Sequence, residues 1–327
     1  MFLESMGNRN IKQIIAKYTL FLELKYAYIY IFAQRRLIDN YSMTQEKHID
    51  IKPFNPNSLP RNPCCAFSGP KGSGKSYCAR SIAYHLRQRI YDATVFTGTT
   101  EQEHPWTQFI PDLFVYDGFY EDVMANVIER QQKRSKMAIK KGMRAAPHLI
   151  IFEDLEYKKK NIFNNETVRR LMLNGRHDEF SVFALVQYVV KGITLENRSM
   201  FTHGFFTKEP NMAVRKTIWR IFGGICTFDD FDAIFKLCTD NHRVFVINIQ
   251  STSYDISESF YYYVPEDRGI FHIGHPDFWI VAEQIRKAAT EQNKSCTKKK
   301  ELEDMTDIKT FAPKTGNVIE LTKPGTE

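Results

Sequence analysis

The chain has 327 residues, more than the roughly 100–200 of a usual domain and enough to bury a full hydrophobic core. It carries 45 Lys and Arg against 38 Asp and Glu, a net charge of +7, and 13% of its residues are aromatic. This composition excludes a disordered chain, and it is compatible with a polyanionic partner without requiring one. The six cysteines form no Cys-x-x-Cys pair, which argues against a zinc or disulfide framework and predicts reduced thiols in a reducing compartment.

The N-terminal segment is apolar but does not have the sequence of a membrane span. Charged side chains interrupt residues 11–32, and the uncharged run 26–34 is nine residues long, against about 20 for a span. No small-residue cleavage site follows, so a signal peptide is not expected. We therefore expect residues 1–49 to be an N-terminal extension, either an amphipathic helix or a stretch upstream of a natural start at Met43.

The rest of the chain alternates apolar runs with amphipathic stretches. Residues 50–63 contain four Pro and three Asn and are expected to be extended or turn-like. Apolar runs predict strands over residues 64–68, 92–97, 112–116, 148–152, 181–187, 203–207 and 243–249, the last of them the last convincing strand in the chain. Helical spacing predicts helices over residues 75–91, 119–141, 166–173, 212–222, 228–238 and 276–289.

This alternation predicts an α/β fold of the P-loop NTPase type, with a mostly parallel central sheet and helices on both faces. We expect the domain to span residues 50–290. Residues 291–327 are polar with few apolar side chains and are expected to be a flexible C-terminal tail. In such folds ligands bind at the carboxyl ends of the strands, and the strongest motifs of this sequence follow predicted strands.

The first of these motifs is a phosphate-binding loop, Gly-x-x-x-x-Gly-Lys-Ser, between the first strand and the first helix. Glycines let the backbone wrap around a phosphate, and successive N–H groups then point at the anion. Lys75 is expected to reach the β- and γ-phosphates of ATP, and Ser76 to place its hydroxyl on Mg²⁺. The predicted nucleotide-binding residues are Gly69, Pro70, Lys71, Gly72, Ser73, Gly74, Lys75 and Ser76.

Two acids, Glu153 and Asp154, follow the strand predicted over residues 148–152. P-loop ATPases need one acid in the metal shell and often a second to orient the attacking water. We therefore predict Ser76, Glu153 and Asp154 as metal ligands and both acids as catalytic residues. The alternative is a buried strand that ends in two solvated acids.

Gln187, Arg176 and Arg198 are further catalytic candidates. If the strand over residues 181–187 lies beside the P-loop strand, the Gln187 amide can contact the γ-phosphate or the water. A guanidinium can neutralise charge on the transferred phosphoryl group. Arg176 is expected on a turn at the functional edge of the sheet, completing a neighbouring subunit's site, and Arg198 within its own subunit. The alternative for each arginine is an ordinary surface position.

A basic cluster without acids lies between residues 130 and 144. It is the best candidate in the sequence for contacts with a DNA phosphate backbone. The alternative is a solvated helix face. Its members are Arg130, Lys133, Arg134, Lys136, Lys140, Lys141 and Arg144.

The order of these elements resembles the genome-packaging ATPases of large double-stranded DNA viruses, the poxvirus-type group of the FtsK–HerA superfamily. That family usually has Asp first in the acidic pair, whereas Glu153 comes first here, which leaves the division of the metal and water roles open. The resemblance covers roughly residues 50–206 and rests on segments 54–60, 69–76, 150–155, 174–177, 187–188 and 197–198.

The resemblance implies an ATP- and Mg²⁺-dependent motor that forms a homo-oligomeric ring and pulls double-stranded DNA into a capsid. Capsid or virion proteins would be further partners, and the virion or the virus factory in the host cytoplasm would be the location. Three alternatives stay open: another FtsK–HerA-like DNA translocase or helicase, a P-loop small-molecule kinase, and a nucleotide-binding scaffold that hydrolyses little. The strand ending at Gln187 argues against the kinase, and the acidic pair argues against the scaffold.

Overall fold

The computed structural model describes residues 49–99, 104–155, 162–288 and 290. The predicted N-terminal extension, the alternative start at Met43 and the predicted C-terminal tail lie outside the described residues. The described strands are β1 (Lys52–Pro53), β2 (Cys64–Ser68), β3 (Asp92–Thr97), β4 (Val115–Tyr116), β5 (His148–Glu153), β6 (Phe180–Val186), β7 (His203–Phe206), β8 (Val244–Asn248) and β9 (Phe260–Tyr263).

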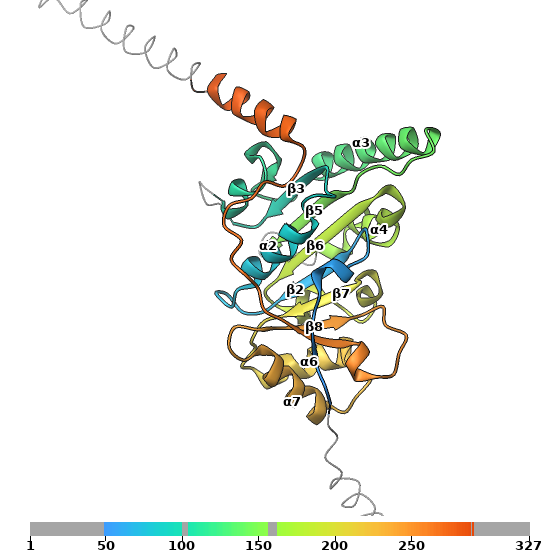
Figure 1. Cartoon of the computed structure of the whole chain (residues 1–327), viewed down its shortest axis with the longest axis vertical. Helices are drawn as coiled ribbons and strands as arrows, with labels where there is room; N and C mark the ends of the chain where they lie inside the picture. Colours follow the sequence, from blue (N-terminus) through green and yellow to red (C-terminus); the bar gives the residue numbers. More distant parts are fainter. Residues whose placement is uncertain (1–48, 100–103, 156–161, 289, 291–327) are drawn as a thin grey trace, which may run out of the picture. The chain divides into compact units, whose positions relative to one another are not determined.

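These strands form one sheet in the order β1-β9-β8-β7-β2-β6-β5-β3-β4 (Figure 1). The prediction of a mostly parallel sheet is confirmed, since β8 alone among these strands runs antiparallel to its neighbours, β7 and β9. The P-loop strand β2 lies in the middle, and β6 separates it from the acidic strand β5. Of the described helices, none is both long and apolar enough to cross a membrane.

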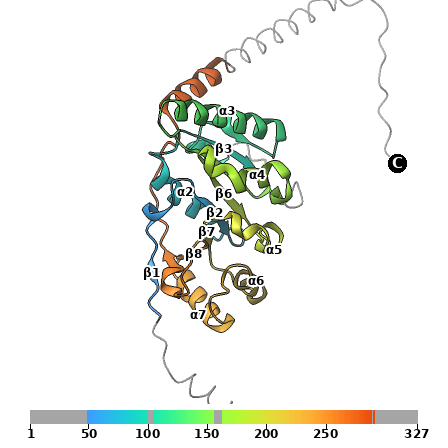
Figure 2. The same cartoon turned by 90° about the vertical axis from the view of Figure 1, so that its right-hand side faces the viewer.

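Helices cover both faces of the sheet, as predicted. Figure 2 shows α2 on one face and α4 and α5 on the other. Ile82 of α2 belongs to the same buried apolar cluster as Phe67 of β2, whose ring lies 4.8 Å from that of Phe205 and 5.0 Å from that of Phe183. The helices are α2 (Lys75–Leu86), α3 (Glu121–Lys140), α4 (Glu166–Asn174), α5 (Val189–Gly192), α6 (Met212–Phe222) and α7 (Phe228–Thr239), with a further helix over residues 276–288.

One strand prediction was wrong, and one strand was missed. The strand predicted over residues 243–249 is confirmed as β8, but β9 after it was missed, because its four residues are too few to give a clear alternating pattern. Most of the strand predicted over residues 112–116 is a 3-10 helix, η3 (Asp112–Phe114), which leaves the two residues of β4. β4 is the edge strand at one end of the sheet, and β9 is the second strand from the other end. In these outer strands tertiary contacts decide more than the local sequence.

After β9 the chain crosses the outer face of α2 before it reaches the helix over residues 276–288 (orange in Figure 1). We call residues 264–275 the strap. The backbone N–H of Glu266 donates to Ser81 Oγ at 3.1 Å, and that of Ile273 donates to the Phe109 carbonyl at 2.8 Å. The strap is therefore fixed to the middle of α2 at its start and to the segment around Phe109 near its end.

Part of the predicted DNA-binding cluster instead anchors α3 to the sheet. Asp92, the first residue of β3, is 2% exposed, and its carboxylate accepts hydrogen bonds from Arg134 at 3.0 and 3.2 Å and from Arg130 at 3.4 Å. His148 Nδ1 lies 2.6 Å from the same carboxylate. Burial would raise the pKa of Asp92, but His148 and Arg134 hold it well below its usual range. Arg134, and to a lesser degree Arg130, therefore neutralise a buried charge, and the expectation that these two arginines contact DNA stays a prediction.

We predict that Asp92→Asn lowers the free energy of unfolding by about 3–5 kcal/mol, because it leaves Arg134 and His148 beside a neutral amide in a buried site. Urea unfolding of the full chain measures this. The matched control is Glu129→Gln, which removes an exposed ion pair between Glu129 and Lys133 on α3 and should change the stability by less than about 0.5 kcal/mol. Equal effects of the two variants would contradict the anchoring role.

Candidate nucleotide-binding site

The P-loop has the conformation of a phosphate cradle. Gly74 caps the N-terminus of α2 with φ 93°, in the left-handed region that glycine adopts without strain. A side chain at Gly69 would place its Cβ 1.8 Å from Thr207 Oγ1, which follows β7. Thr207 Oγ1 also donates to Ser73 Oγ at 2.7 Å, and Ser73 Oγ donates to the Pro70 carbonyl at 2.7 Å. The loop is thus closed on itself and fixed to the neighbouring strand.

A cavity of about 350 Å³ lies against this loop. Lys75, 7% exposed, borders it, and its Nζ lies 3.7 Å from Asp154 Oδ1. Six of the eight predicted nucleotide-binding residues line the cavity, whereas Gly69 and Ser73 shape the loop behind it. The full lining is Pro70, Lys71, Gly72, Gly74, Lys75, Ser76, Tyr77, Arg80, Thr99, His104, Pro105, Glu153 and Asp154.

Glu153 is the last residue of β5, and hydrogen bonds fix both of its carboxylate oxygens. Ser76 Oγ donates a short hydrogen bond to Oε1, and Trp106 Nε1 donates to Oε2 at 2.6 Å. His104 Nε2 lies 3.5 Å from Oε2. The carboxylate is therefore held at the first turn of α2, next to the hydroxyl predicted to contact Mg²⁺.

Asp154 lies on the open side of the site in a strained backbone conformation. Its φ of 48° is in the left-handed region, which non-glycine residues adopt at a cost and often at functional sites. Gln187 Nε2 donates to Asp154 Oδ2 at 2.8 Å, so β6 brings the predicted amide to the acid. Asp154 Oδ1 is buried and has no hydrogen-bond partner among the described residues. It is available to a water molecule or an ion.

The oxygen atoms at this site suit a magnesium ion that also binds the nucleotide. Within the described residues, no group of three or more His, Cys, Asp or Glu could hold a metal alone. The Ser76 hydroxyl, the Glu153 carboxylate and Asp154 Oδ1, which faces the Lys75 ammonium without a hydrogen bond, are hard oxygen ligands. Mg²⁺ is typically held by one or two such protein ligands together with substrate phosphates and water.

The two candidate arginines lie at the opposite edge of the sheet. Arg176 is in η6 (Gly175–Asp178), directly before β6, and its carbonyl accepts a hydrogen bond from Asn62 Nδ2 at 3.1 Å. Arg198 is in η7 (Asn197–Met200), before β7, and donates to the Ile221 carbonyl at the end of α6 at 2.8 Å. The seven residues of β6, at about 3.3 Å each, separate the two edges by roughly 20 Å.

The expectations for these arginines are corrected accordingly. Arg176 is on a turn as expected, but that turn lies at the amino edge of the sheet and not at the functional edge. Arg198 cannot reach the P-loop of its own subunit, and it stabilises the C-terminus of α6 instead. The physical reason is that the residue before a parallel strand and the residue after it lie at opposite edges.

Several residues at the site were missed by the sequence analysis. Trp106 and His104 follow β3, and Thr207 follows β7, so both groups come from strands whose carboxyl ends meet at the P-loop. Gly98 was also missed, although it comes directly after β3, and a Cβ there would lie 2.0 Å from the Asp154 carbonyl. Reading every strand end of the parallel sheet as part of the site would have found them.

The chain is similar to viral proteins. It is 25% identical to the uncharacterized protein L437 of Acanthamoeba polyphaga mimivirus over 234 residues, 70% of this chain and 81% of that protein. It is 28% identical to the uncharacterized protein 088R of Invertebrate iridescent virus 3 over 236 residues, 68% of this chain and 87% of the relative. For the uncharacterized protein 015R of Frog virus 3 the identity is 27% over 217 residues, 65% of this chain and 66% of the relative. The expected relationship to proteins of viruses is confirmed.

No protein-family model matches the chain. Among solved structures, the genome packaging NTPase B204 of Sulfolobus turreted icosahedral virus 2, in complex with AMPPCP, has a TM-score of 0.48 and 12% identity over 65% of this chain and 100% of that one. The pCW3 conjugation coupling protein TcpA, in its monomer form with ATPgS, has a TM-score of 0.43 and 13% identity over 70% of this chain and 65% of that one. The assignment to the P-loop NTPase fold rests on this chain's own loop, strand order and strand ends.

We predict that Gly98→Ala weakens Mg-ATP binding about tenfold or more, because the added methyl group displaces the backbone that carries Glu153 and Asp154. Gly224→Ala is the control, since a Cβ there meets no atom within 4 Å. Titration calorimetry with the full chain measures both variants. Unchanged affinity in Gly98→Ala would show that the end of β5 does not have to be held in place for binding.

Proposed function

We propose that this protein is an ATPase that drives double-stranded DNA into a viral capsid. The ATPase part is carried by one observation: Lys75, Ser76, Glu153 and Asp154 converge on a single cavity at the carboxyl edge of the sheet. The packaging part is supported by the motif order that resembles viral packaging ATPases and by the similarity to viral proteins. The virion or the virus factory in the host cytoplasm is the proposed location.

The backbone N–H groups of the P-loop and the Lys75 ammonium bind the β- and γ-phosphates in this proposal. Ser76 and Glu153 would hold a magnesium ion, which would supply positive charge to neutralise the phosphate oxygens. Glu153 takes this role because its carboxylate is hydrogen-bonded to the Ser76 hydroxyl. Trp106 keeps the carboxylate in that orientation by donating to its second oxygen.

Asp154 orients the attacking water. Gln187 fixes one of its oxygens. The other lies 3.7 Å from the Lys75 ammonium, has no hydrogen-bond partner among the described residues, and can accept a hydrogen bond from water. The division of roles between the two acids thus follows from their contacts: Glu153 touches the metal-side hydroxyl, and Asp154 touches the amide of β6. This arrangement favours a hydrolase over a scaffold that only binds nucleotide.

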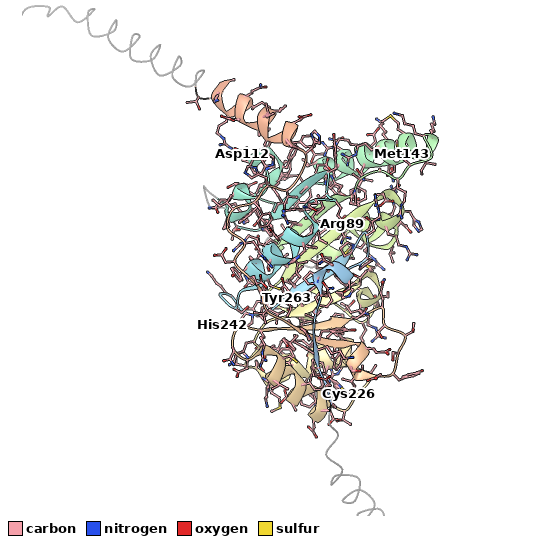
Figure 3. All side chains as sticks on the ribbon, in the orientation of Figure 1. Arg89, Asp112, Met143, Cys226, His242 and Tyr263 are labelled. Carbon is pink, nitrogen blue, oxygen red and sulfur yellow. The ribbon has the colours of Figure 1, made fainter. Side chains whose placement is uncertain are left out.

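The DNA contact lies at the far end of α3 in this proposal. Lys136, Lys140 and Lys141 are exposed there, and Figure 3 shows Met143 just beyond the end of the helix. Arg144 is 63% exposed although it donates to Glu179 at 2.7 Å. These four residues are what remains of the predicted cluster once Arg130 and Arg134 are assigned to Asp92 and Lys133 to Glu129.

A homo-oligomeric ring and a contact with capsid or virion proteins complete the proposal. The ring would let a residue of one subunit complete the site of the next. Arg176 can act only in this way, since its own P-loop lies at the other edge of the sheet. Its role in a neighbour's site stays a prediction.

We predict that the full chain hydrolyses ATP and that linear duplex DNA stimulates the hydrolysis. Lys75→Ala should abolish nucleotide binding, whereas Asp154→Asn should bind ATP and lose turnover by about 10²-fold or more. Glu153→Gln should mainly weaken the Mg²⁺ dependence. A phosphate-release assay with and without DNA, combined with binding measurements, checks all three. Hydrolysis that DNA does not change would contradict the motor and leave the kinase and scaffold alternatives.

A variant in which Lys136, Lys140 and Lys141 are all Gln should bind duplex DNA more weakly, while ATP hydrolysis without DNA is retained. Each lost phosphate contact should reduce the slope of log affinity against log salt by about 0.9. The matched control is Lys287→Gln on the C-terminal helix, an exposed lysine paired with Glu283. A triple variant with the parent's salt slope would show that this end of α3 is a solvated surface.

A further inference from the structure

A second cavity adjoins the one on the P-loop. It has a volume of about 320 Å³, within the range of small-molecule sites, about 300–1,000 Å³. The two cavities share Tyr77 and Arg80 of α2, so they meet along the first half of that helix. The wall facing α2 is made by the strap. The full lining is Tyr77, Arg80, Ser81, Gln108, Phe109, Glu266, Asp267, Arg268, Gly269, Ile270 and Phe271.

The strap wall is held in place on both sides of the cavity. The Phe271 ring lies 4.8 Å from the ring of Phe109 and 5.2 Å, edge-on, from that of Tyr84. At the other side of the cavity the Glu266 N–H donates to Ser81 Oγ. Between Glu266 and Phe271 the strap turns at Gly269, which has φ 60° and whose N–H donates to Asp267 Oδ1 at 2.9 Å. The turn leaves Ile270 71% exposed at the rim. The wall is therefore preformed, with an apolar side chain that no interior packing explains.

Arg80 lies between the two cavities. Its guanidinium carbon is 5.7 Å from the centre of the Phe109 ring. Burial lowers the pKa of Arg80, and the charges of Glu153 on the P-loop side and Asp267 on the strap side raise it. A cation in this position can neutralise the phosphate closest to the sugar of a nucleotide that extends from one cavity into the other.

We propose that the strap binds the sugar and base of the nucleotide whose phosphates bind to the P-loop. This inference rests on the proposed ATPase function and adds where the nucleoside is recognised. Ile270, Phe271 and Phe109 provide apolar surface for the base. Carboxylates accept hydrogen bonds from ribose hydroxyls, and Glu266 and Asp267 are the carboxylates on this wall.

The strap comes late in the chain, 190 residues after the P-loop when counted from Ser76 to Glu266. Its contribution should therefore be separable from that of the P-loop. The P-loop binds any triphosphate, whereas the strap distinguishes a nucleoside triphosphate from inorganic tripolyphosphate. Removing strap contacts should reduce the affinity for ATP alone.

The test compares ATP with inorganic tripolyphosphate, each with Mg²⁺, by titration calorimetry on the full chain. The strap variant is Asp267→Ala combined with Ile270→Ala, both at exposed positions, so that folding is preserved. The matched control is Val264→Ala, which is exposed on the same strap but lines neither cavity. We expect the parent to bind ATP more tightly than tripolyphosphate, and the strap variant to lose about tenfold for ATP alone.

The other outcomes separate the strap assignment from the proposed ATPase function. An unchanged ATP affinity in the strap variant, or equal losses for ATP and tripolyphosphate, overturns the strap as the nucleoside site while the P-loop assignment stands. A parent protein that binds neither ligand overturns the proposed ATPase function itself. An azido-adenine photoprobe gives an independent readout, because it should label peptides from the strap or Tyr77, and labelling confined to other segments would count against the inference.

Discussion

Parallel pairing of β2, β6 and β5 determines where the chemistry of this protein can occur. Ala66 of β2 is in register with Ala184 of β6, and Val182 of β6 with Ile150 of β5. Because the three strands run in the same direction, the residues that follow them meet at one edge. The P-loop, Gln187 and the acidic pair are therefore brought together by the backbone hydrogen bonds between these three strands. The contacts within the site refine an arrangement that the sheet imposes.

The parallel strand direction also gives the carboxyl edge and the amino edge of the sheet different sets of functional side chains. The carboxyl edge holds the phosphate cavity, and the amino edge holds Arg176 and the residues that precede the strands. Helix α3 runs from one edge to the other, and the buried charge of Asp92 fixes its position through Arg134. The lysines at its far end consequently lie away from the nucleotide. A coupling between DNA and hydrolysis would have to be transmitted through the sheet, or through contacts with a neighbouring subunit.

Sequence reasoning succeeded where the signal was local. The glycines of the P-loop all lie within one short loop and are recognisable from the sequence alone. Helix α6 was predicted with its observed bounds because apolar residues recur at helical spacing along its whole length. It failed where the deciding contact is distant in sequence. The sequence around Arg134 does not show that its guanidinium will form an ion pair with Asp92. The sequence around Trp106 does not show that its indole N–H will donate to Glu153. Arg176 and Arg198 were misplaced for a different reason, since strand direction alone puts residues before and after a strand at opposite edges.

The order of the two acids is explained by what each one must reach. Glu153 ends a strand, and its extra methylene group lets one carboxylate contact both Ser76 on α2 and Trp106 on the segment after β3. Asp154 follows in a left-handed conformation that turns the chain out of the strand, so the shorter side chain is sufficient to meet Gln187. Gly98 allows this turn because it leaves room for the Asp154 carbonyl. The order Glu153-Asp154 therefore fits the positions of Trp106, Gln187 and Gly98. Exchanging the two acids alone would place the shorter side chain opposite Ser76 and Trp106 and the longer one opposite Gln187.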